Sequence, residues 1–123
     1  MARLKAGRLL SALALAGVTL SGCGTGGALH QARAACVKVE KALSLYAMSQ
    51  RASLTPPQRA ALQARAMATL LAATPEAAAA TSADGSWNPL MTTIGEAQRV
   101  PLGNLVPALT RLCAIADSSQ PYL

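Results

Sequence analysis

Residues 29–117 contain almost no stretch that could form a β-strand, and this restricts the chain to helical folds. The sequence has no Phe, one Trp and two Tyr, and its Val and Ile residues are sparse, so the residue types that favour strands are scarce. Alanine, which has the highest helix propensity, is abundant instead. We therefore expect an all-α domain.

Apolar residues recur at alternating spacings of three and four in the first part of this region, as they do on one face of a helix. This stripe comprises Leu29, Ala32, Cys36, Val39, Leu43 and Tyr46. It predicts a first helix from about residue 29 to residue 51.

Proline residues divide the next part of the chain into shorter helices. Thr55 and Gln58 flank two prolines in the arrangement of a capping box, which predicts a second helix over residues 56–73. Pro75 disfavours helical backbone at the residue before it. We therefore expect a break there and a short helix over residues 75–81, with a kink in one long helix as the alternative.

Two further helices are predicted in the last third of the chain. Turn-forming residues at 82–86 precede a helix predicted over residues 87–99. A last helix is predicted over residues 105–116, capped by Asn104, with Pro107 in its first turn, where a missing amide removes no hydrogen bond. The apolar residues expected in the core of the later helices are Leu62, Met67, Leu70, Leu71, Trp87, Leu90, Met91, Ile94, Leu105, Leu109, Leu112, Cys113 and Ala116.

The first 22 residues have the pattern of a secretory signal peptide. Residues 1–8 carry three basic and no acidic side chains, and an apolar run over residues 9–20 follows them. This is the order of the charged and apolar regions of a signal peptide. The run is twelve residues long, whereas a helix needs about 20 apolar residues to span a bilayer.

The apolar run ends in the tetrad Leu20, Ser21, Gly22 and Cys23. An aliphatic residue, two small residues and a cysteine in this order resemble the lipobox of bacterial lipoproteins. The resemblance implies that a signal peptidase recognises Leu20, Ser21 and Gly22 and cuts before the cysteine, whose thiol carries a diacylglyceryl group. Two acyl chains hold a protein stably on a membrane.

The lipobox resemblance predicts both the domain organisation and the location of the protein. The expected parts are a signal peptide at 1–22, a lipidated cysteine and flexible tether at 23–28, a helical domain at 29–117 and a C-terminal tail at 118–123. The mature protein is expected on the extracytoplasmic face of the cell membrane, with the membrane as its partner through Cys23. Ordinary signal-peptidase cleavage at the Ala-x-Ala pattern of residues 32–34 is the alternative.

A second resemblance covers the mature chain. Its cues are two widely spaced cysteines on the outer helices, the Ser86-Trp87 pair, and the segment from Val100 to Leu105. In these features the chain is similar to small secreted or lipid-anchored actinobacterial proteins. This resemblance implies no known activity.

Cys36 and Cys113 lie near the two ends of the predicted domain. An extracytoplasmic location permits a disulfide between them, and the bridge would join the first and last helices. No C-x-x-C pattern and no histidine cluster accompany them, which disfavours metal ligation, and two buried free thiols remain the alternative. The sequence thus predicts a small antiparallel bundle of four to five short helices, closed by this disulfide.

The charge of the chain does not indicate a nucleic-acid partner. The formal net charge is +6, but Arg3, Lys5 and Arg8 belong to the predicted signal peptide, so the mature chain carries eight basic and five acidic residues. Arg33, Lys38 and Lys41 form a basic side of the first helix close to the anchor. We expect these three side chains to form a solvated face, with contact to anionic lipid as the alternative.

No residue pattern in the chain indicates catalysis or a cofactor. His30 is the only histidine, and the acidic residues stand singly, whereas a structural zinc site needs about four ligands and glycosidase chemistry needs paired carboxylates. We therefore expect no metal, no cofactor and a non-enzymatic binding or accessory module that binds another envelope protein or a small ligand. The sequence gives no oligomeric state.

Two alternatives to a non-enzymatic module depend on convergence in the fold. An enzyme site would need at least two of four side chains to meet in one pocket, namely Glu40, Glu96, Asp117 and His30. A haem or redox carrier would use the two cysteines, or His30 with one of three methionines, namely Met48, Met67 and Met91.

Overall fold

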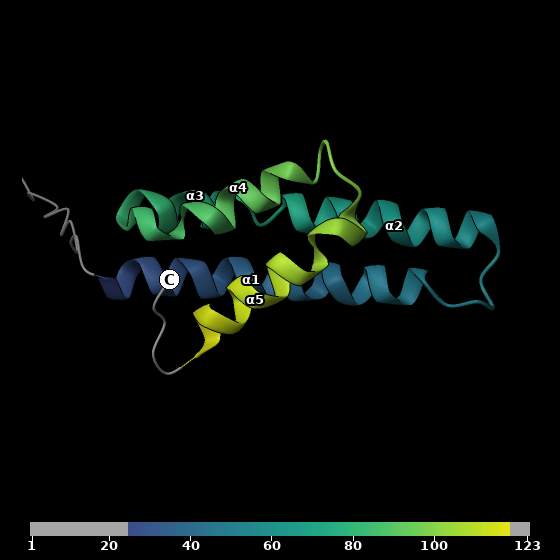
Figure 1. Ribbon diagram of the computed structural model, residues 1–123, viewed down its shortest axis with the longest axis horizontal. Coiled ribbons are helices and arrows are strands. Elements are labelled where there is room, and N and C mark those ends of the chain that lie inside the picture. Colours follow the sequence, from purple (N-terminus) through teal and green to yellow (C-terminus); the bar gives the residue numbers. More distant parts are fainter. Residues whose placement is uncertain (1–24, 119–123) are drawn as a thin grey trace, which may run out of the picture.

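The computed structural model describes residues 25–118, and these residues form a helical bundle (Figure 1). Its elements are α1 (Thr25–Ser49), α2 (Pro56–Leu71), α3 (Thr74–Ala83), a 3-10 helix η1 (Gly85–Trp87), α4 (Asn88–Glu96) and α5 (Leu102–Asp117). The described residues include no strand, which confirms the predicted all-α fold. The predicted signal peptide, the lipobox tetrad and residues 119–123 of the predicted tail lie outside the described residues.

The long helix α1 is the centre of the bundle, because α2, α3 and α5 all pack against it (Figure 1). Most of the side chains that α1 buries are small, and alanines at positions 28, 32, 35 and 42 are fully inaccessible. The distance between two packed helices depends on the side chains at their contact. Alanine therefore lets three helices approach α1 closely, and this compensates for the shortage of large apolar residues.

The buried face of α1 differs from the predicted stripe. Leu29, Leu43 and Tyr46 are only partly buried, whereas Leu45 and the neighbouring alanines lie in the core. The physical reason is that three helices cover α1, so its buried arc is wider than one stripe and is centred on small residues. The larger side chains lie at the edges of that arc.

The start of α1 also differs from the prediction. The helix begins at Thr25, and Ala28 is fully buried. Residues 25–28 of the predicted flexible tether are therefore helical, and the first two residues of that tether lie outside the described part. A lipid on Cys23 would be joined almost directly to a helix of the bundle.

The predicted boundary signals of α2 are confirmed. Thr55 accepts a hydrogen bond from the Gln58 amide (3.3 Å), and the Gln58 side chain accepts one from the Thr55 amide (2.9 Å), which completes the capping box. The helix ends at Leu71 and α3 begins at Thr74. The chain therefore breaks near Pro75, as predicted, and does not continue as one kinked helix.

The helix predicted over residues 87–99 is shorter in the structure. Asp84 caps a 3-10 turn by accepting a hydrogen bond from the Ser86 amide (3.0 Å), and α4 then covers only Asn88–Glu96. The turn places the Trp87 side chain, 3% exposed, in the core. Packing of this large aromatic ring fixes the junction between α3 and α4.

The last helix begins three residues earlier than predicted. Pro101 has extended backbone (φ −53°, ψ 135°) and is the N-cap of α5, so Asn104 is not the cap. Pro107 consequently lies inside the helix and not in its first turn. Since proline has no amide hydrogen, the carbonyl of Gly103 lacks its usual partner four residues later. Burial of Leu102, 6% exposed, holds this first turn on the bundle.

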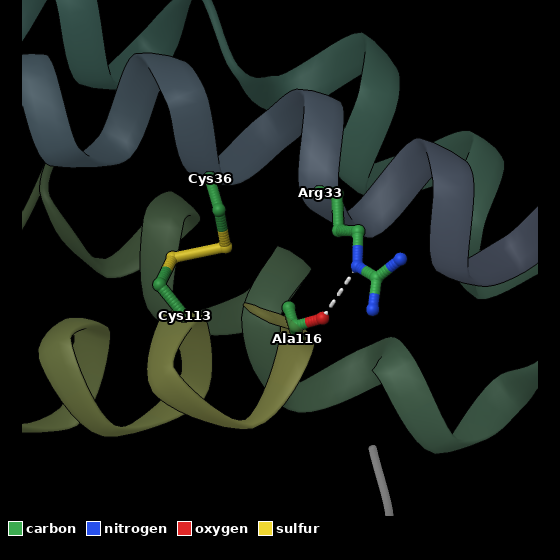
Figure 2. The surroundings of a disulfide bond; sticks show 4 residues. All are labelled: Arg33, Cys36, Cys113 and Ala116. Carbon is green, nitrogen blue, oxygen red and sulfur yellow. Dashed lines mark hydrogen bonds between the residues drawn. A yellow bond between two sulfur atoms is a disulfide. The ribbon is translucent and has the colours of Figure 1, made fainter. Parts of the chain in front are cut away.

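A disulfide joins Cys36 of α1 to Cys113 of α5, as the sequence predicts (Figure 2). The two Cα atoms are 5.5 Å apart, inside the range that a disulfide requires. Both cysteines are buried, with exposed fractions of 1% and 2%. The bridge therefore lies inside the seam between the first and last helices.

Candidate functional site

A half-open groove lies between α1, α2 and the start of α5. Its lining residues are Tyr46, Gln63, Met67, Pro101, Leu102 and Gly103. The groove has a volume of about 220 Å³, below the roughly 300–1,000 Å³ of pockets that hold drug-sized ligands. It exceeds the cavity of about 150 Å³ that is known to admit benzene. The groove can therefore hold one ring or one branched aliphatic group.

A close approach between Tyr46 and Gly103 shapes one wall of this groove. A Cβ atom at Gly103 would collide with the Tyr46 hydroxyl. A side chain at position 103 would therefore require the Tyr46 ring to shift. The backbone angles impose no such requirement, because no described glycine has a positive φ. The contact joins the first turn of α5 to the second half of α1.

The chemistry of the lining residues is that of a binding site. Met67, Pro101 and Leu102 provide apolar surface, while the Tyr46 hydroxyl and the Gln63 amide provide hydrogen-bonding groups. A mostly apolar surface with few polar groups is typical of ligand sites. The six lining residues include no carboxylate, imidazole or thiol, and the Tyr46 hydroxyl is the one titratable group among them.

Two of the three basic residues considered for contact with lipid, Arg33 and Lys38, have partners within the protein. Arg33 donates from Nε to the Ala116 carbonyl (2.8 Å; Figure 2) and from a terminal nitrogen to the Ser118 carbonyl (3.2 Å). Its guanidinium therefore satisfies carbonyls at the end of α5, where the helix dipole favours positive charge. These hydrogen bonds lie beside the disulfide, so the end of α5 is held to α1 in two ways.

Lys38 has the same role at the end of α2. Its ammonium donates to the Ala72 carbonyl (3.1 Å) and to the Glu76 carboxylate (2.5 Å). This ammonium lowers the pKa of Glu76 below its usual range. Lys41 is exposed. Two of these three basic side chains thus stabilise helix ends.

A third basic residue, whose position in the sequence suggests only a solvated side chain, caps α1. Arg59 of α2 donates to the Ser49 carbonyl (3.0 Å) and to the Arg51 carbonyl (3.4 Å). Each of these basic side chains reaches from one helix to the end of another.

Two of the acidic residues considered for an enzyme site are neighbours. A hydrogen bond to Asp117, together with partial desolvation and charge repulsion, raises the pKa of Glu40. Both side chains are nevertheless exposed and neither lines the groove. Glu96 instead forms an ion pair with Arg99. None of the four side chains, Glu40, Glu96, Asp117 and His30, lines this groove.

Of the candidate haem ligands, His30 and Met48 are widely separated. His30 is exposed near the start of α1, and Met48 follows it by 18 residues in the same helix, a distance of about 27 Å along the axis. Met67 lines the groove beside Tyr46. Within residues 25–118, no three side chains of His, Cys, Asp or Glu are grouped as a metal site.

Comparison with family models, with curated proteins and with solved structures gives no match for this chain. None of the helices in the described part has the length and apolar character needed to cross a membrane.

Proposed function

We propose that the mature protein is a lipid-anchored, non-enzymatic binding or accessory module of the bacterial cell envelope. The observation that carries this proposal is the tetrad Leu20, Ser21, Gly22 and Cys23 at the end of a signal-like segment. The tetrad accounts for a stable attachment to the outer face of the membrane, because two acyl chains suffice for it.

The geometry of the bundle is consistent with a module that holds its groove away from the membrane. The first described residue, Thr25, is two residues after Cys23, and Tyr46 follows Thr25 by 21 residues in α1. An α-helix of that length spans about 32 Å. An anchor at Cys23 would therefore leave the groove at the opposite end of α1, and the disulfide and helix caps would hold the two ends in a fixed relation.

Membrane fractionation of matched cysteine variants tests the anchor. Cys23→Ser removes the proposed lipid attachment, so we expect it to abolish diacylglyceryl modification and to leave the chain unprocessed. Cys36→Ser is the matched control, since it breaks the disulfide and leaves the tetrad intact. Unchanged processing and lipid labelling in Cys23→Ser, or the same loss in both variants, would contradict the proposal.

Chemical cross-linking in intact cells tests the binding role. A module that binds another envelope protein should give a discrete adduct of higher mass, and denaturing the membranes before cross-linking should remove that adduct. A protein that cross-links only as a monomer, and to which no small ligand remains bound after purification in mild detergent, would contradict a binding role while leaving the anchor unaffected.

A further inference from the structure

The basic and acidic residues of the described domain are unevenly distributed between its two ends. We call residues 44–66 and 96–104 the distal end; it contains the α1–α2 connection, the α4–α5 connection and the groove. The charged residues of the distal end are Arg51, Arg59, Arg65, Arg99 and a single acid, Glu96. The rest of the described domain contains Arg33, Lys38, Lys41, Arg111, Glu40, Glu76, Asp84 and Asp117.

This distribution places the entire net positive charge of the described domain at one end. Four basic and four acidic residues balance in the remainder, whereas the distal end has four basic residues and one acid. The Debye length is about 8 Å at physiological ionic strength. The excess positive charge therefore attracts an anion bound at the distal end, whereas salt screens its interaction with a molecule bound near the start of α1.

Two basic residues are close in sequence to residues that line the groove. Arg59 precedes Gln63 by one helical turn in α2. Arg99 is two residues before Pro101, and its side chain is 74% exposed although it pairs with Glu96. Arg59 already donates to the Ser49 and Arg51 carbonyls, whereas Arg99 forms only an exposed ion pair with Glu96. Arg99 is therefore the guanidinium that we assign to an anionic group next to the groove, and guanidinium groups bind carboxylates with two parallel hydrogen bonds.

The size of the groove restricts what enters it. A volume of about 220 Å³ holds one bulky side chain and excludes a complete drug-sized ligand. The half-open form leaves room for the rest of a longer molecule to continue over the surface. A single anchoring side chain in a pocket, surrounded by polar contacts, is the usual arrangement of a protein interface hot spot.

We propose that this groove binds one large apolar side chain from an acidic segment of a partner protein. The Tyr46 hydroxyl and the Gln63 amide would pair with the backbone of that segment, and Arg99, with the excess positive charge of the distal end, would attract its carboxylates. The proposal rests on the function proposed above, since it names the site and the kind of partner for the binding role.

Three synthetic peptides test this assignment. The first has a central Phe with two acidic residues on each side, the second replaces Phe by Ala, and the third replaces the acidic residues by Lys. Each is titrated into the full mature, isotope-labelled protein in a neutral detergent, and backbone amide shifts are followed by NMR. We expect the first peptide to shift the amides of Gln63, Leu102 and Gly103, and the other two to bind at least about tenfold more weakly.

A pair of charge variants provides the control on the protein side. Arg99→Glu reverses a charge next to the groove, and we expect it to weaken binding of the acidic Phe peptide by about two- to fivefold or more. Arg111→Glu makes the same change on the exposed surface of α5 and should leave that affinity within a factor of about 1.5.

Several results would overturn the groove assignment. They are equal binding of the acidic and basic peptides, equal effects of the two charge variants, shifts confined to other amides, or no shift at millimolar peptide. Shifts that depend on protein concentration alone would mean that a second copy occupies the groove, which would also overturn it. If cells still yield the cross-linked adduct with Arg99→Glu at wild-type level, the binding role stands and only this site is refuted.

Discussion

The disulfide between Cys36 and Cys113 should provide a large share of the stability of the domain. The two residues are separated by 77 positions. Loop closure over that length lowers the entropy of the unfolded chain enough to stabilise the fold by about 4.5 kcal/mol at 25 °C. Small domains are stable by only about 5–15 kcal/mol in total. Replacing both cysteines by alanine should therefore leave a marginally folded protein.

Urea unfolding followed by circular dichroism measures this effect. With a denaturant dependence of about 1–3 kcal/mol per molar urea, the midpoint of Cys36→Ala/Cys113→Ala should fall by about 1.5–4.5 M. Wild-type protein that has been unfolded, reduced and then measured in excess reductant should give nearly the same midpoint, which controls for the substitutions themselves. A midpoint shift of less than about 0.5 M in both samples would refute the loop-closure argument.

Three further predictions follow from contacts in the bundle. Gly103→Ala should destabilise the fold by about 1–3 kcal/mol in thermal unfolding, because its Cβ collides with the Tyr46 hydroxyl. Adding Tyr46→Phe in the same chain should recover part of this loss. If the stability losses of the two single variants simply add in the double variant, the collision is contradicted. Arg59→Ala should cost about 1 kcal/mol by removing the cap of α1, and an unchanged unfolding midpoint would show that solvent replaces the cap. The Lys38 ammonium lowers the pKa of Glu76, so its stabilisation is present above the ordinary value of 4.5 and is lost as the pH falls through the folded-state value. Lys38→Met should flatten that part of the stability–pH curve, and an unchanged curve would argue against the pair.

The helical fold could be predicted because its signals are local. The capping box of Thr55 and Gln58 depends on residues three apart, and the break near Pro75 depends on one neighbour. The disulfide could also be predicted, since only two cysteines lie in the domain and the expected compartment permits their pairing. Each of these inferences uses short-range chemistry or simple counting, and the structure confirms them.

The features that the sequence did not predict concern contacts between helices. Pro101 is the N-cap of α5 and Leu102 its first residue, because the bundle buries that turn. Asn104 resembles a helix cap only when the local sequence is considered without the rest of the bundle. Arg33 and Lys38 lie off the apolar stripe and thus resembled a solvated or lipid-facing surface. Their partners, carbonyls at the ends of α5 and α2, are 83 and 34 residues away along the chain. No local pattern could indicate those pairings.

The groove could not be predicted from the sequence for the same reason. Three of its lining residues come from separate helices, namely Tyr46, Met67 and Gly103. The sequence suggested that the first two are core residues and that Gly103 is a loop residue. The close approach of the Tyr46 ring to a glycine backbone exists only once α5 lies across α1. The one local hint was a glycine immediately after a buried leucine in the segment Pro101–Gly103.

The intact mass of the protein purified from membranes tests the central claim most directly. We expect a chain that begins at Cys23 and carries a diacylglyceryl group, with Cys36 and Cys113 resistant to alkylation until the protein is unfolded and reduced. A mass that retains residues 1–22, or one without lipid on Cys23, would contradict the anchored module and with it the proposed location of the protein.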